Sequence, residues 1–297
     1  VALAQARLLV ARTKPNPELA GSADHLDWLG TGYDDVNGAG PPEYAVRVDF
    51  PLLQGKRGLR STVARRALSI ARLLYENAER QLVYDVRSAC VDVQAAEASR
   101  ELHHDSAEFM ARVVKAAEGR VKSGALKEVD LARSRVALLT VRNSELDTAD
   151  RLVIAEERLL LLMGRTPGTV SLDLQDELRR VAEVPTREQA LREALSSRPD
   201  LLAARAELER VRSDLALQEA GVKPSFTVGT EVRRQQGLAG QGSSAGLFFA
   251  IPLTVSDRNQ GEIERARQEV EQVRLRVKAL ENSIALEAAG AFKLLGL

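Results

Sequence analysis

The feature that most limits what this chain can fold into is a very long stretch without helix breakers. Between Leu59 and Glu118 the sequence runs for 60 residues without a glycine or a proline, and a second such run of 39 residues extends from Ala125 to Met163. Both runs are rich in Ala, Leu, Glu and Arg, which favour the α-helix. At 1.5 Å per residue the first run predicts a helix roughly 90 Å long. A helix of that length cannot fold around a compact core, so we expect it to lie along other helices.

Apolar residues in the helical segments recur at alternating steps of three and four, which is the spacing of helices that pack along their length. This spacing is present in residues 201–215 and 263–284. The 39-residue run carries two such lanes side by side. They consist of Ala132, Leu139, Leu146, Val153 and Leu160, and of Leu131, Leu138, Leu152 and Leu159 with an interruption at Glu145. Two lanes predict two neighbouring helices, as in a closed array, whereas an ordinary coiled-coil scaffold remains the alternative.

Composition excludes several classes of function. The chain has 42 basic and 42 acidic residues, a balance that argues against a nucleic-acid partner. It has a single cysteine, Cys90, and its histidines, His25 and the pair His103-His104, lack the spacing of metal ligands. The histidine pair falls in a charged helical stretch and is interpreted as part of a solvated face. Neither a nucleophile elbow nor a phosphate-binding loop is present, so we predict no enzyme activity, no catalytic, cofactor or metal residues, and no cofactor.

Glycine and proline are concentrated in two blocks, because 21 of the 30 fall in residues 15–58 and 221–261. Strict alternation within these blocks predicts β-strands. One apolar face is formed by Tyr44, Val46, Val48 and Phe50, and another by Leu247, Phe249, Ile251 and Leu253. Charged residues of opposite parity, expected on the other face, are Arg47, Asp49 and Glu231. A further strand is predicted from about Pro17 to Trp28, with hairpin loops at 29–42 and 234–245; a small sandwich attached to the helices is the alternative.

The two blocks belong to an internal repeat. Each block follows a helical segment and has a proline near its start. Near its end it contains Pro-Leu, which a polar, glycine-containing turn and a long helix follow. The predicted segments are the end of a helix (1–14), a first β-hairpin (15–54), a long helical hairpin with its tip near 119–127 (55–164), a connecting segment (165–186), a helix of the second repeat (187–222), a second β-hairpin (223–254), and the start of a second long helical hairpin (255–297).

Several short stretches carry a resemblance to a known family. They are Asn16-Pro17-Glu18-Leu19, Gly55-Lys56-Arg57, Arg198-Pro199-Asp200-Leu201, Ile251-Pro252-Leu253 followed by Asp257-Arg258-Asn259-Gln260-Gly261, and the spacing from Gly124 to Asp130. Their order and spacing resemble the outer membrane efflux proteins, the TolC-like outer-membrane factors of tripartite pumps. The similarity covers the whole chain and is strongest toward the heavy-metal branch, the cobalt–zinc–cadmium and copper–silver resistance channels.

The resemblance implies a mainly helical fold in which long antiparallel helical hairpins form an α-barrel tunnel through the periplasm. It also implies a homotrimer whose chains each contribute four strands to one 12-stranded barrel in the outer membrane of a Gram-negative bacterium. The alternating faces then acquire roles. Tyr44, Val46, Val48, Phe50, Leu247, Phe249 and Ile251 are expected to face lipid, and Arg47, Asp49 and Glu231 to face a wet lumen.

The turn between the two long helices is the predicted docking site, again by resemblance. A periplasmic adaptor (membrane fusion) protein is expected to bind there, and the closed channel to be constricted there. The residues concerned are Gly119, Arg120, Val121, Lys122, Ser123, Gly124 and Leu126. Physically, two glycines allow the backbone to reverse and a partner helix to approach. Lys127 stands where family members often place a serine before the returning helix, so an unusual helix start is expected.

The sequence leaves the following interpretations open. The favoured one is a passive exit duct for an inner-membrane pump, of the RND type, with heavy-metal ions as possible substrates. The alternatives are the outer-membrane duct of a type I protein secretion system and a coiled-coil scaffold without a pore. By internal symmetry we also expect a second tip and return helix, on the order of 60–100 residues, to follow Leu297.

Overall fold

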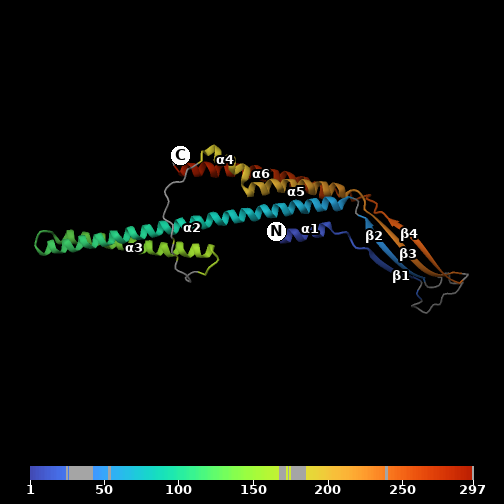
Figure 1. The fold of residues 1–297 in the computed structure, drawn as a ribbon, viewed down its shortest axis with the longest axis horizontal. Coiled ribbons are helices and arrows are strands. Elements are labelled where there is room, and N and C mark those ends of the chain that lie inside the picture. The colour runs from blue at the N-terminus through green and yellow to red at the C-terminus, as the bar shows by residue number, and fades with distance from the viewer. Residues whose placement is uncertain are drawn as a thin grey trace. The chain divides into compact units, whose positions relative to one another are not determined.

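The computed structural model describes residues 1–24, 26, 43–52, 55–166, 172, 174, 185–237 and 240–295. These residues form long helices and one four-stranded sheet, which confirms the predicted mainly helical fold with a small β part (Figure 1). In chain order the elements are α1 (Ala2–Arg12), β1 (Glu18–Asp24), β2 (Glu43–Leu52), α2 (Lys56–Lys122), α3 (Glu128–Leu162), α4 (Arg187–Ser197), α5 (Pro199–Gly221), β3 (Phe226–Gly237), β4 (Gly240–Ala250) and α6 (Gln260–Leu294).

The chain divides into two compact units. The first comprises Val1–Tyr75 and Arg187–Leu297, and the second comprises Glu76–Thr186. Helix α2 is one uninterrupted helix of 67 residues, as its breaker-free sequence predicts. It contributes residues to both units.

The second unit is a helical hairpin of α2 and α3. Its core consists of Ala89 and Val93 from α2 packed against Leu152 and Leu159 from α3. Small alanines on α2 let the two helices approach closely, and the leucines of one α3 lane fill the seam. The other lane remains exposed over most of its length, since Leu139, Leu146 and Val153 are 59%, 66% and 52% accessible. Only one of the two predicted contacts of α3 is therefore made within this unit.

In the first unit, α5 and α6 lie side by side and α4 packs against them (Figure 1). Leu201, Val277 and Ile284 are the buried centre of this layer. The single helix expected over 187–222 is divided in two at Pro199. Proline has no amide hydrogen and restricts the residue before it, so Arg198 adopts an extended conformation with ψ 121° and α5 begins afresh at Pro199.

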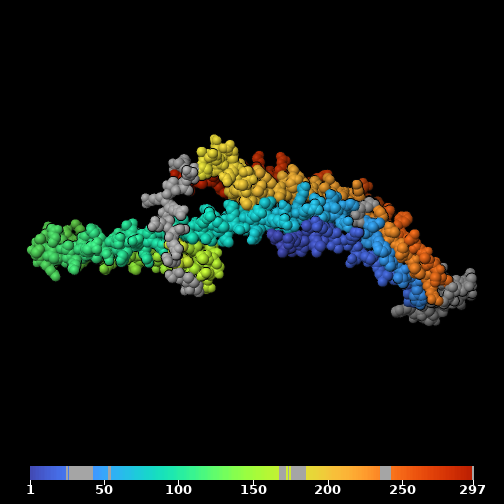
Figure 2. Space-filling view, viewed as in Figure 1, coloured from blue at the N-terminus to red at the C-terminus, as the bar shows by residue number. Residues whose placement is uncertain are grey.

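The four strands form one antiparallel sheet in the order β1-β2-β3-β4. Register pairs Gly21 with Val46, Val46 with Val232, and Val232 with Ala245. In the view of Figure 2 no helix covers these strands. The central pairing of β2 with β3 joins the two glycine- and proline-rich blocks, which lie far apart in the sequence.

Two sequence predictions about the second hairpin are wrong. The 12-residue loop expected at 234–245 is mostly strand, because pairing continues to Gly237 opposite Gly240; sheet pairing uses backbone groups, so polar and glycine residues do not prevent it. Leu253 and Ile251, both predicted as strand positions, lie beyond the end of β4, Ile251 by one residue. Pro252 follows it and cannot donate to the ladder, which ends at Ala250.

The strand predicted from about Pro17 begins at Glu18 and is described to Asp24. Trp28, the loop at 29–42 and most of the connecting segment 165–186 lie outside the described residues.

Candidate functional site: a two-faced sheet and a helical turn

The sheet has one apolar face that is open to its surroundings. Residues opposite each other in an antiparallel sheet point to the same side, so the register assigns each residue to a face. Apart from Arg234, which lies opposite Tyr44 at one end, the apolar face gathers Leu19, Tyr44, Val46, Val48, Phe50, Val228, Val232, Leu247 and Phe249. Most of these side chains are exposed, Leu247 and Phe249 by 82% and 75%. An exposed apolar surface of this extent indicates contact with lipid or with another protein.

The opposite face is charged. Its described acidic residues are Glu18, Asp24, Glu43, Asp49 and Glu231, and its basic residues are Arg47 and Arg233. With five acids and two bases, this face carries a formal charge of −3 in each chain. The predicted grouping of Arg47, Asp49 and Glu231 on one face, opposite Tyr44, Val46, Val48 and Phe50, is therefore seen in the register.

Arg47 is held in place from two sides. Its Nε donates to Asp49 Oδ2 at 2.9 Å, and its guanidinium carbon lies 4.1 Å from the centre of the Phe248 ring. A Cβ at Gly229 would come within 2.3 Å of Asp49 Oδ1 and 2.7 Å of the Phe248 ring, so only glycine leaves room for both side chains. We call Arg47, Asp49, Gly229 and Phe248 the arginine cluster. The second oxygen of Asp49, Oδ1, is buried and accepts no hydrogen bond from the described residues.

Arg233 makes the second charged group of this face. It pairs with Glu43 at 3.0 Å and with Glu231 at 3.1 Å. The alternation that identified Glu231 also puts Arg233 on its face, two residues further along β3. Phe248 and Gly229 could not be found that way, because their importance depends on the cross-strand register.

The turn between α2 and α3 is closed by hydrogen bonds typical of a helix that ends on a left-handed glycine. Gly124 has φ +76°; its amide donates to the Val121 carbonyl at 2.9 Å, and the Ala125 amide donates to the Arg120 carbonyl at 2.8 Å. Gly124 therefore has the conformational role that was predicted. Gly119 does not: it lies inside the last turns of α2, and a Cβ there would contact nothing within 4 Å.

The other predicted residues of the turn are at its surface. Arg120, Lys122 and Ser123 are exposed, whereas Val121 and Leu126 are half-buried. Helix α3 starts without a side-chain cap, since Lys127 occupies the cap position and makes no capping hydrogen bond, as expected. A shallow cavity of about 690 Å³ lies beside the turn, lined by Gly124, Leu126 and residues of the first turns of α3.

Two of the motifs that carry the family resemblance join elements of the first unit. The Asn259 Nδ2 group donates to the Gln218 carbonyl at 2.8 Å, and Asn259 itself adopts φ 58°, which allows α6 to start directly beside the end of α5. A side chain at Gly221 would lie within 2.7 Å of that amide. Lys56 extends from the start of α2 to the Gly221 carbonyl at 3.4 Å and to Ser225 Oγ at 3.2 Å.

The Arg198-Pro199-Asp200-Leu201 motif stabilises the α4–α5 corner. Arg198 forms two hydrogen bonds with Asp200, at 3.1 and 2.7 Å, and one with Glu287 on α6 at 2.7 Å. These bonds, with that to Asp200 the largest contribution, raise the pKa of Arg198, so the guanidinium remains charged. The contacts of Lys56, Asn259 and Arg198 therefore have structural roles.

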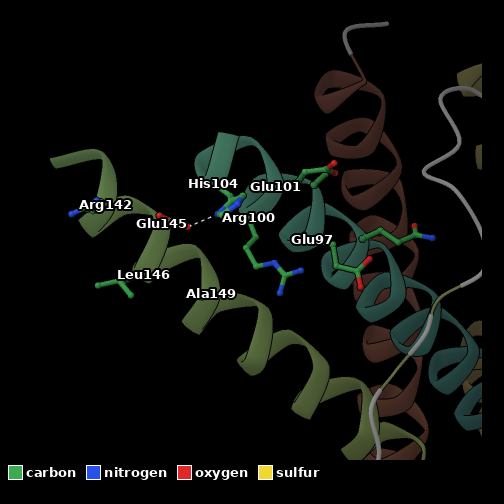
Figure 3. Close-up of a pocket in the computed structure, with 10 residues that line it drawn as sticks. Glu97, Arg100, Glu101, His104, Arg142, Glu145, Leu146 and Ala149 are labelled. Carbon is green, nitrogen blue, oxygen red and sulfur yellow. Dashed lines mark hydrogen bonds and ion pairs between the residues drawn. The ribbon is translucent and has the colours of Figure 1, made fainter. Parts of the chain in front are cut away.

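A groove of about 1010 Å³ in the second unit contains the histidine of the charged stretch (Figure 3). His104 Nδ1 on α2 lies 2.7 Å from Glu145 Oε1 on α3. That hydrogen bond is the largest cause of a raised pKa of His104, and Glu108 and Asp105 act in the same direction. Glu145 is the residue that interrupts an apolar lane in the sequence, and its partner explains the interruption. The Nδ1–H group of His103 donates to the Ser99 carbonyl of its own helix at 2.8 Å.

Among the described residues, no three His, Cys, Asp or Glu side chains are arranged to hold a metal ion. Over the same part of the chain, no helix is both long and apolar enough to cross a membrane.

The sequence matches the outer membrane efflux protein family over residues 1–165 and 190–292. The chain belongs to this family. It is 28% identical over 263 residues to the cobalt-zinc-cadmium resistance protein CzcC of Cupriavidus metallidurans. That similarity covers 87% of this chain and 59% of CzcC, so the chain spans less than two thirds of its relative's length.

Solved outer-membrane proteins have the same fold. The outer-membrane channel OprN is similar with a TM-score of 0.77 and 18% identity, over 99% of this chain and 70% of OprN. CusC, described in connection with transmembrane channel formation, gives 0.73 and 17% over 99% and 70%. VceC of Vibrio cholerae gives 0.69 and 17% over 95% and 72%. At these identities the similarity concerns the fold alone.

Family membership confirms the resemblance inferred from the motifs and the outer-membrane location that it implied. The family consists of outer-membrane channel proteins and not of enzymes. The similarity to CzcC agrees with the predicted heavy-metal branch.

Proposed function

We propose that this chain is part of the outer-membrane exit duct of a tripartite efflux pump, which conducts substrates passively while the inner-membrane pump supplies the energy. The observation that carries the proposal is the two-faced sheet. Lipid accepts only strands whose backbone groups are all paired and whose outward side chains are apolar. The sheet offers one apolar, exposed face and one charged face, which suit lipid and a water-filled lumen.

The dimensions of the sheet support a membrane location. Strands β2 and β4 have 10 and 11 residues, and a tilted strand of about 9–11 residues spans a bilayer. On the apolar face, Phe50 and Phe249 share one row with Val228, and Tyr44 lies six positions before Phe50. At about 3.3 Å per residue these aromatic residues are about 20 Å apart. Aromatic residues at both edges of an apolar band are typical of membrane barrels.

The edges of the sheet support association of three copies. Strands β1 and β4 are the outer strands, and within the described chain each pairs on one side only. An unpaired edge is unfavourable in lipid, so the sheet must close on other copies. Three four-stranded sheets give the twelve strands that the family resemblance implies.

The exposed lane of α3 supports the same assembly in the helical part. Leu139, Leu146 and Val153 lie on the side of α3 that has no partner within its hairpin. In a closed array of helices a neighbouring copy covers such a lane. The resulting α-barrel is the periplasmic tunnel of the proposal.

The turn at residues 119–127 is the proposed docking site for the periplasmic adaptor. Arg120 and Lys122 present positive charge at its surface, and the open space at Gly119 allows another helix to approach the end of α2. The pump partner is proposed to be of the RND type and the substrates to be heavy-metal ions, on the basis of the similarity to the resistance protein CzcC.

Two neighbouring residues of β4 test the orientation of the sheet. Ser244 belongs to the charged face and Ala245 to the apolar face, and both are exposed. Ser244→Cys and Ala245→Cys, each in a Cys90→Ser background, are labelled with a fluorophore and reconstituted into lipid vesicles. We expect iodide in water to quench the label at 244 and a quencher dissolved in the lipid to quench the label at 245. Equal quenching at both positions by either agent would contradict the proposal.

A further inference from the structure

We propose that the junction between the sheet and the helices is a binding site for an anionic phospholipid. The inference rests on the proposed membrane location of the sheet. Its starting point is a cavity of about 510 Å³ between the end of α1, the end of β2 and the start of α2. This volume lies within the range of 300–1,000 Å³ typical of small-molecule sites.

The cavity combines an apolar wall with two cations. Phe50, Pro51 and Leu52 from β2 and Pro15 from the α1–β1 connection form the wall, and Lys14 and Arg57 are the charged residues that line it. None of the described residues that line the cavity is acidic. A ligand that fits must therefore be negatively charged at one end and apolar over much of its length.

Both cations are available to a ligand. Lys14 and Arg57 are exposed, and neither makes an ion pair with any described residue. Their neighbour Lys56 is different, because its amino group is bound to the Gly221 carbonyl and to Ser225. Two cations beside one cavity, neither of them paired with an acid in the described part of the chain, provide charge complementarity to a phosphate group.

The position of the cavity favours a lipid over a soluble anion. Phe50 and Leu52 belong to the apolar face of the sheet, so the wall of the cavity continues the surface proposed to meet the bilayer. Lysine and arginine at such a boundary extend their charged ends toward lipid headgroups. An acyl chain lies along Phe50 and Leu52, and the headgroup phosphate lies between Lys14 and Arg57.

The test uses the full-length protein in detergent, titrated with phosphatidylglycerol or with phosphatidylcholine of the same acyl chains, and native mass spectrometry as readout. Each interfacial cation contributes about a fivefold gain in affinity for an anionic lipid. Lys14→Gln/Arg57→Gln is thus expected to weaken phosphatidylglycerol binding by about 25-fold and to leave phosphatidylcholine binding unchanged. The charge-retaining variant Lys14→Arg/Arg57→Lys should bind as the unmodified protein does.

The matched control is Arg276→Gln/Lys278→Gln, which removes the same two residue types from an exposed part of α6 and should have no effect. Equal loss in the control, or unchanged binding in the first variant, would overturn the site. Competition by soluble glycerol phosphate as strong as that by the lipid would also overturn it, since the site would then be one for a free phosphate.

The result is separable from the duct itself, because binding is measured without conduction. Lipid binding that depends on Lys14 and Arg57 in a protein that forms no pores would contradict the duct alone. Pores in a protein whose lipid binding ignores these charges would contradict the lipid site alone.

Discussion

Gly229 provides the sharpest test of the arginine cluster. In Gly229→Ala the new Cβ would lie 2.3 Å from Asp49 Oδ1 and 2.7 Å from the Phe248 ring. Ordinary van der Waals contact requires about 3.4 Å or more, so both side chains must move by roughly 1 Å and the stacking of Arg47 on Phe248 is disturbed. Inserting a methyl group into such a packed place destabilises by about 1–3 kcal/mol.

Gly246→Ala is the matched control. Gly246 lies on the same charged face in β4, and a Cβ there would contact nothing within 4 Å. Because alanine reduces the conformational freedom of the unfolded chain, this change is expected to be neutral or to stabilise by up to about 1 kcal/mol.

The assay is differential scanning calorimetry of the detergent-solubilised protein at one scan rate, since unfolding of large assemblies is often irreversible. At about 2–4 °C per kcal/mol, Gly229→Ala should lower the transition temperature by roughly 2–12 °C, and Gly246→Ala should not lower it. Equal transition temperatures for the two variants would refute the account of the cluster.

Three further predictions concern the turn, the groove and the charged face. Gly124→Ala should destabilise the hairpin by about 1–2 kcal/mol because Gly124 has φ +76°, whereas Gly119→Ala inside α2 should stabilise it by up to about 1 kcal/mol. Thermal unfolding followed by circular dichroism compares the two variants. A higher unfolding temperature for Gly124→Ala than for Gly119→Ala would be inconsistent with the turn described. NMR titration should find the pKa of His104 above its ordinary value, and Glu145→Gln should lower that pKa. The stabilisation of the hairpin by this pair is then fully present below about pH 6.5 and is lost as pH rises through the raised pKa. An unchanged pKa of His104 in the variant would count against the pairing. Glu18→Lys changes the charge of the face from −3 to −1 per chain, so the reversal potential in a salt gradient should shift toward anions, more at low salt than at high salt; no shift would show that this face does not line the conducting path.

The sequence predicts the elements of this fold well where one residue type or one period dominates. The absence of glycine and proline from 59 to 118 identifies α2, and the alternation from Tyr44 to Phe50 identifies β2 and its two faces. Proline also marks the two boundaries that the prediction missed, at Pro199 and Pro252. Both breaks follow from the missing amide hydrogen, which a reading based on hydrophobic spacing alone overlooks.

Contacts between residues far apart in the chain could not be predicted in this way. The sequence shows Glu145 as an interruption of an apolar lane and His104 as part of a charged stretch, and only the packing of α2 on α3 brings the two within 2.7 Å. The same holds for Lys56, whose partner Ser225 is 169 positions away. The arginine cluster depends on the register between three strands, which the matching of apolar faces and the turn geometry set together, so the sequence of any single strand does not reveal it.

The central claim is that the chain forms a conducting duct. Its most direct test is single-channel recording of the purified full-length protein in a planar lipid bilayer. Circular dichroism first verifies that the preparation is folded. The account predicts discrete current steps of uniform size, produced by a trimeric species. A folded, membrane-inserted trimer that produces no current steps would contradict it.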